Sequence, residues 1–145
     1  MSNASAQFDA IVKEITENIK LQMESRAFRG ANELRNASLL ILRGQRGGRR
    51  YRVPGTKRYY TASAPGEPPA ARTGVFRLSW QPSAHVIFGS YISRVESTAR
   101  TDNGRYILGD LLENGTSKMA PRPHQDKILE KAEPNIVKIY SEPYM

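Results

Sequence analysis

Apolar side chains recur at steps of three and four residues along the first part of the chain, from residue 5 to residue 42. This spacing places them on one face of an α-helix, and no proline interrupts the pattern. The members of this apolar stripe are Phe8, Ile11, Val12, Ile15, Ile19, Met23, Ala27, Ala31 and Leu34. We expect the stripe to form core rather than a face for a partner.

The length of this helix has a consequence of its own. A helix over residues 5–42 would extend for about 57 Å at 1.5 Å per residue, which exceeds the diameter of a small domain. Part of it must therefore project or pack on another subunit. Gly30 costs about 1 kcal/mol relative to alanine inside a helix, which leaves a kink or a division into two helices open.

The pattern changes twice after residue 42. Residues 43–74 are rich in Gly, Pro and Arg and hold only short strand-like pieces at 51–53 and 58–62, so they predict a long extended loop, functional or disordered. Strand-like alternation follows at 75–80, 84–88, 91–98 and 104–112, with a turn at 101–104. A last helix is predicted at 122–132, with Pro134 ending or breaking it.

These elements predict one α+β domain over residues 1–145. It comprises a long N-terminal helix (5–42), a basic loop (43–74), an antiparallel sheet of about four strands (75–112) and a turn, helix and tail (113–145). We expect the C-terminal helix to pack on the sheet.

Charge is concentrated in the loop. The 145-residue chain has a net charge of +8, and residues 43–72 hold eight cations against a single acid, Glu67, which gives +7. The candidate contact residues are Arg46, Arg49, Arg50, Arg52, Lys57 and Arg58. With Tyr51, Tyr59 and Tyr60 interleaved, they suit phosphates and stacked bases, while arginine also pairs with carboxylates of an acidic protein. A mobile, solvated loop is the third alternative.

Catalytic chemistry has little support in the sequence. Cysteine is absent, and neither His85 nor His124 stands at metal-ligand spacing from other ligands. We expect His85 to be a strand residue of the core or surface and His124 to be an interface or solvent residue. The sequence thus predicts a protein that is not an enzyme and takes no cofactor or metal. Without a signal-like or membrane-spanning run, we expect a soluble protein of the cytoplasm.

Two segments carry motifs. Pro-Gly-Glu-Pro-Pro at residues 65–69 is close to polyproline II and suits docking between subunits or a rigid crossover within one. Residues 111–123 combine a Gly turn with two prolines, which predicts a rigid turn that aims the last helix. The candidate subunit or neighbour contacts are Pro65, Gly66, Glu67, Pro68, Pro69, Gly115, Thr116, Met119, Pro121 and Pro123.

Both motifs, in this order, resemble the gene-product-ten-like tail-component family of lambdoid tailed phages, which comprises neck or head–tail joining proteins. The family similarly carries the Pro-Gly-Glu-Pro-Pro loop, and after it the pattern Thr-Gly-x-Leu-Arg-x-Ser. In this chain the pattern begins at Thr73, and Phe76 replaces the leucine. The family also shows phenylalanine and then Leu-Arg-Pro after the position of Pro123, where this chain continues from His124 to Lys127. The resemblance covers residues 63–132, about half of the chain.

The resemblance implies a structural virion protein at the head–tail interface, assembled in the host cytoplasm as a six-fold or twelve-fold ring around the DNA channel. It implies as partners other copies of the chain, a head-side adaptor or stopper, and a tail-side terminator or tube protein, with packaged double-stranded DNA as a further candidate. Tail termination, or a small basic nucleic-acid-binding protein, are the alternatives. A channel lined by all of these loops would hold duplex DNA tightly, so we favour an acidic protein neighbour for the loop.

Overall fold

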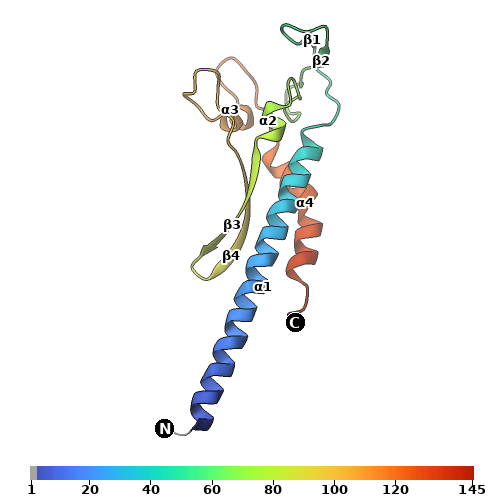
Figure 1. Cartoon of the computed structure of the whole chain (residues 1–145). Helices are drawn as coiled ribbons and strands as arrows, with labels where there is room; N and C mark the ends of the chain where they lie inside the picture. The colour runs from blue at the N-terminus through green and yellow to red at the C-terminus, as the bar shows by residue number, and fades with distance from the viewer. Residues whose placement is uncertain (1–2) are drawn as a thin grey trace.

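A single long helix, α1 (Asn3–Ile41), organises the computed structural model, which describes residues 3–145 of the chain (Figure 1). It passes through Gly30 as one element, so the alternative of two helices is wrong. Strand β4 (Ser90–Ser97) comes close to α1 at Gly30: the Ser93 hydroxyl donates to the Ala27 carbonyl at 2.7 Å, and a Cβ at Gly30 would collide with that hydroxyl. The glycine is thus required for packing, at the cost of helix propensity.

The longest strands form a hairpin that lies along α1 (Figure 1). β3 (Trp80–Ile87) pairs antiparallel with β4, from Trp80 opposite Ser97 to Ile87 opposite Ser90. Phe88 and Gly89 connect them with φ values of 49° and 77°, the left-handed pair of a two-residue hairpin turn whose twist matches the strands. The hairpin includes the predicted strands at 84–88 and 91–98.

The α+β class is confirmed, but the sheet is smaller than predicted. The second pair of strands, β1 (Arg50–Arg52) and β2 (Tyr59–Thr61), forms a separate two-stranded sheet inside the basic loop. Residues 75–78 form a short helix, α2 (Val75–Leu78), which begins after Gly74 at a φ of 84°. Residues 108–114 form α3 (Leu108–Asn114) rather than a strand, because Leu108, Leu111 and Leu112 recur at helical spacing.

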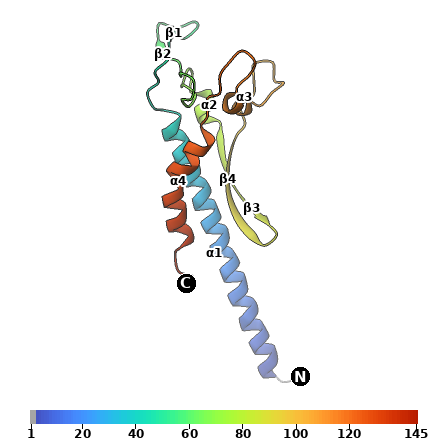
Figure 2. The ribbon, with the colours of Figure 1, turned by 180° about the vertical axis from the view of Figure 1, so that it is seen from behind.

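The core lies between α1, the start of the hairpin and the last helix, α4 (Gln125–Tyr140). Its buried members are Leu34, Ala37, Leu42, Trp80, Ile128 and Ala132. Contrary to prediction, α4 packs mainly along α1 instead of covering a sheet, as the view from behind also shows (Figure 2). It also continues through Pro134, which lies on the exposed side, where water can replace the lost backbone hydrogen bond while Ile128 and Ala132 hold the buried side.

The end of the chain fixes how much of α1 is covered. Arg29 forms a bidentate ion pair with Glu142, at 2.8 and 2.9 Å, and the Arg26 guanidinium lies 3.9 Å from the centre of the Tyr144 ring. The residues of α1 before Asn18, whose side chain donates to the Met145 carbonyl at 3.3 Å, run beyond both α4 and the hairpin (Figures 1 and 2). None of the described helices is long and apolar enough to cross a membrane.

We call the exposed residues 3–17 of α1 the arm. Its apolar side chains lie on one stripe and stay in solvent: the exposed fractions of Phe8, Ile11, Val12 and Ile15 are 66, 55, 45 and 54%. The expectation that this part of the stripe is core is therefore wrong. The buried residues of α1 begin at Arg26, in the part of α1 against which the hairpin and α4 lie.

Candidate interaction site

The basic loop folds into a ribbon at the end of the molecule beyond the C-terminus of α1 (Figure 1). β1 and β2 pair from Arg50 opposite Thr61 to Arg52 opposite Tyr59. The connecting turn is closed by a hydrogen bond from the Val53 N–H to the Arg58 carbonyl at 2.9 Å, and Val53 is buried. The short strand-like pieces predicted in this loop are thus confirmed as strands, and the loop has a defined shape.

One face of this ribbon presents guanidinium groups to solvent. Arg50, Arg52 and Tyr59 share that face because opposite and alternate residues of paired strands point the same way. The Arg50 guanidinium lies 4.5 Å from the centre of the Tyr59 ring, and Arg52 donates from Nε to the Thr56 carbonyl at 2.6 Å. These contacts order the side chains before any partner binds, and each guanidinium keeps N–H donors for an anion.

Arg46, predicted as a contact residue, instead anchors the ribbon to the fold. Its guanidinium donates to the carbonyls of Pro68 at 2.7 Å, Pro69 at 3.1 Å and Ile41 at 2.8 Å, and also to Gln45. Burial lowers the pKa of the Arg46 guanidinium, an effect opposed by the charge of Glu67. Arg46 therefore joins the end of α1 to the Pro-rich loop and offers little to an external partner.

Glu67 supplies the second anchor. Its carboxylate accepts from the backbone N–H of Gly47 at 2.9 Å and of Ala64 at 2.6 Å. These two hydrogen bonds hold the pKa of the Glu67 carboxyl below its usual value; burial acts in the opposite direction, and the charges of Arg46 and Lys127 lower the pKa further. The acid of the Pro-Gly-Glu-Pro-Pro motif is thus required within the subunit, where it closes the base of the ribbon.

The two motif segments lie against each other. The Gly66 N–H donates to the Pro121 carbonyl at 3.2 Å, and Arg122 donates to the Ser63 hydroxyl at 2.8 Å. The Lys127 ammonium, in the first turn of α4, donates to the Gly66 carbonyl at 3.0 Å. Residues 63–69 and 115–123 therefore form one connected platform beside the ribbon, as expected for a rigid crossover within the subunit, while docking between subunits stays a prediction.

Within the platform, some candidate contacts are free and others are not. Pro65, Gly66 and Pro121 are exposed, as is Thr116, whereas Pro69 is buried. The half-buried candidates are Glu67, Pro68, Gly115, Met119 and Pro123. The exposed members form the part of the platform that a neighbouring protein can reach.

Gly115 has a steric role in the platform. Its φ is 76°, and a Cβ there would lie 2.8 Å from both the Met119 carbonyl oxygen and the Pro121 nitrogen. The Thr116 N–H bonds to the Met119 carbonyl at 2.9 Å and completes the tight turn. The predicted rigid turn that aims the last helix is therefore present, and only glycine fits at its first position.

Beneath this turn His124 pairs with Glu113, a contact that sequence spacing does not reveal. His124 is fully buried, so the expectation of an interface or solvent residue is wrong. The Glu113 carboxylate accepts from the backbone N–H of His124 at 2.8 Å and of Gln125 at 3.2 Å, and lies 3.0 Å from His124 Nδ1. A carboxylate at a helix N-terminus satisfies free N–H groups and the helix dipole. Because Glu113 lies eleven positions before His124, no local capping pattern could reveal it.

Within residues 3–145 the structure contains no group of three or more side chains able to hold a metal ion. His85 is exposed on β3 and contacts the Ser83 hydroxyl at 2.9 Å through Nε2. Of the six basic residues predicted as contacts, five lie exposed on the ribbon: Arg49, Arg50, Arg52, Lys57 and Arg58.

Comparison of the chain with family models, with curated proteins and with solved structures gives no match. The resemblance to phage neck proteins accordingly continues to rest on its two motifs.

Proposed function

We propose that this chain is a structural virion protein of a tailed phage that joins head and tail as a ring of identical subunits around the DNA channel. The observation that carries the proposal is the incompleteness of the isolated subunit. Its arm leaves an apolar stripe uncovered, and within the described chain neither outer edge of the β3–β4 hairpin pairs with another strand. Isolated two-stranded hairpins are marginal, and open edges recruit further strands.

Assembly is the mechanism in this proposal. Neighbouring copies cover the exposed apolar surface, and contacts between different faces of identical subunits close a ring. The platform and the ribbon lie at one end of the subunit and the arm projects at the other (Figure 1). We assign the platform and ribbon to the neighbouring head-side or tail-side protein, with the guanidinium groups of Arg50 and Arg52 directed at its carboxylates.

The test is interruption of the gene by an early stop codon in the phage that encodes it, followed by negative-stain microscopy of lysates. Filled heads beside detached tails of normal length are expected. Overlong tails would assign the chain to tail termination instead. Intact virions would refute any role at the head–tail interface.

A second function, binding of nucleic acid, is favoured by the exposed guanidinium face of the ribbon. Arg50 stacks on Tyr59, and stacked guanidinium groups suit phosphates as well as carboxylates. Micromolar binding of short duplex DNA by the purified protein, lost when Arg49, Arg50 and Arg52 are replaced by serine, would support this alternative. Binding with no dependence on salt or on these arginines would refute it, since each neutralised phosphate contributes about −0.9 to the salt slope.

A further inference from the structure

The arm has an apolar face with an acid on either side. The exposed apolar members of its stripe are Phe8, Ile11, Val12 and Ile15. At about 100° per residue, Asp9 and Glu14 flank this stripe on its two sides. Lys13 and Glu17 lie on the opposite side of the helix. The face that requires cover therefore combines apolar side chains with two negative charges and no positive charge, which favours a basic partner surface.

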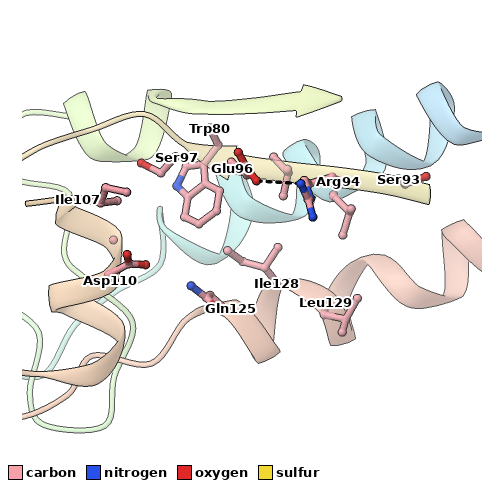
Figure 3. A pocket seen from close by; sticks show the side chains of 13 residues that line it. Trp80, Ser93, Arg94, Glu96, Ser97, Ile107, Asp110, Gln125, Ile128 and Leu129 are labelled. Carbon is pink, nitrogen blue, oxygen red and sulfur yellow. Dashed lines mark ion pairs between the residues drawn. The ribbon is translucent and has the colours of Figure 1, made fainter. Parts of the chain in front are cut away.

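The hollow between β4 and α4 does not suit this face (Figure 3). Its charged lining residues are Arg94, Glu96 and Asp110, one cation against two acids, so the lining has a net charge of −1. The single cation is already paired, since the Arg94 guanidinium lies 3.4 Å from the Glu96 carboxylate. A lining with an excess of negative charge repels the acidic flanks of the arm.

A second hollow lies between α2, α3 and the platform, at the end of the subunit opposite to the arm (Figure 1). It is open to solvent and has a volume of about 740 Å³. Its larger apolar lining residues are Leu42, Val75, Phe76, Leu108, Leu112 and Met119. Val75 is 67% exposed and most of the others are half-buried, so apolar side chains of this hollow also require cover. We call it the α2–α3 hollow.

The α2–α3 hollow has a basic lining. Its charged residues are Arg72, Arg77, Arg100, Arg122 and Asp102, four cations against one acid, a net charge of +3. Within residues 3–145 no ion pair joins any of these arginines to a carboxylate. Arg77 and Arg122 donate instead to neutral oxygens, the Leu39 carbonyl at 2.9 Å and the Ser63 hydroxyl at 2.8 Å. The apolar lining is thus combined with positive charge that no acid of the subunit neutralises, the complement of the arm.

The arm cannot reach this hollow within its own subunit. The arm ends at residue 17, and α1 continues as one helix to Ile41, next to Leu42 in the lining. These 24 residues of helix separate the two surfaces by about 36 Å at 1.5 Å per residue. Docking therefore requires a second copy of the chain. Pairing of arm with arm would bring four acids together, whereas an arm in the α2–α3 hollow meets opposite charge.

We infer that the arm of one subunit docks in the α2–α3 hollow of a second copy of this chain. The inference rests on the proposed function, since it names the two faces through which copies in the ring meet. Two different faces form a heterologous contact, which propagates from subunit to subunit and closes a ring where the rotation between copies allows it. Neither the exposed platform residues nor Arg50 and Arg52 belong to the lining, so they stay available to a neighbouring protein.

Cross-linking tests this contact directly, because the sequence contains no cysteine. One full-length variant carries Ile11→Cys on the arm, and a second carries Val75→Cys in the α2–α3 hollow; both positions are exposed, so folding is retained. The control for the hollow is Leu129→Cys, an exposed position in the hollow between β4 and α4. The control for the arm is Leu21→Cys, exposed on α1 beyond the arm. Concentrated protein is oxidised at about 0.15 M salt and resolved on denaturing gels.

A mixture of the Ile11→Cys and Val75→Cys variants is expected to give a cross-linked dimer and nothing larger, whereas a chain with both substitutions should give a ladder. An equal yield of dimer from the Ile11→Cys variant alone would overturn the inference in favour of pairing between arms. An equal or higher yield from Ile11→Cys with Leu129→Cys would overturn it in favour of the other hollow. A yield no higher than that of Leu21→Cys with Val75→Cys would overturn it as well.

Charge reversal on the two sides of the arm supplies a second measurement. Glu14→Lys and Glu17→Lys make the same change of charge, but only Glu14 flanks the stripe. Glu14→Lys should lower the yield of the specific dimer about threefold or more, as loss of an exposed ion pair and its replacement by repulsion imply. Glu17→Lys should change the yield little, because the Debye length at this salt is about 8 Å. Equal yields from the two variants would overturn the inference.

These results are separable from the proposed function. Cross-linking at the level of the controls, combined with presence of the chain in virions, would refute the docking and leave the neck role standing. A specific cross-link combined with intact virions lacking the chain would refute the neck role and leave the docking.

Discussion

Replacing Arg46 by methionine tests whether this residue anchors the ribbon or contacts a partner. Methionine keeps the apolar stem and removes the guanidinium, which donates to carbonyls at the end of α1 and in the Pro-rich loop at 2.7 to 3.3 Å. Hydrogen bonds from a charged donor contribute about 1.5 to 3 kcal/mol each. Water can reach some of these carbonyls and the contributions do not add, so we expect the free energy of unfolding to fall by about 2 to 4 kcal/mol.

The assay is urea unfolding followed by far-ultraviolet circular dichroism, with Arg43→Met as the control. Arg43 is exposed three positions earlier, and its replacement should change the unfolding free energy by less than about 0.5 kcal/mol. Limited proteolysis should also cut the Arg46→Met ribbon faster than that of the parent chain. Equal unfolding curves for the two variants would refute the anchor role and return Arg46 to the partner surface.

Three further predictions follow from individual contacts. Gly30→Ala should lower the free energy of unfolding by about 1 to 3 kcal/mol through overpacking, despite the gain in helix propensity. Adding Ser93→Ala should recover part of the lost stability, whereas a Gly30→Ala protein more stable than the parent would contradict the close contact between Gly30 and Ser93. The fold lowers the pKa of the Glu67 carboxyl, so the stability lost in Glu67→Gln should be constant above the unfolded-state pKa of 4.5 and vanish as the pH falls through the folded-state pKa. A loss of stability in Glu67→Gln that persists in acid would contradict this role of the ionised carboxylate. Arg50→Ser with Arg52→Ser should leave urea unfolding nearly unchanged but reduce plaque titre in complementation, and an unchanged titre excludes a contact role.

The spacing of apolar residues along the sequence predicted α1 and the two long strands. The α1 helix follows from its three- and four-residue steps, and the hairpin follows from alternation on both sides of a turn-forming glycine. Residues 104–112 were misread as a strand because a short apolar run does not by itself decide between strand and helix, although the steps of three and four residues from Leu108 to Leu111 and Leu112 are helical. Pro134 was misread because its effect depends on which side of α4 is exposed, which only the packing determines.

The site was predictable in composition but not in the roles of its residues. Sequence spacing identified the basic ribbon and both motif segments, yet it could not distinguish Arg46 and Glu67, which bind within the subunit, from Arg50 and Arg52, which face solvent. Their partners lie about twenty positions away in sequence. The length of α1 predicted that part of it projects or packs on another subunit, but which residues project could not be predicted, because this depends on where α4 and the hairpin end along α1.

Counting copies of the chain in purified virions tests the central proposal most directly. Peptides from this protein are quantified by mass spectrometry against isotope-labelled standards, and the number of particles is taken from the encapsidated DNA. The ring proposal predicts a fixed number of copies per particle, about six or twelve, as a closed ring of identical subunits requires. Absence of the chain from purified, infectious virions would contradict the proposed function.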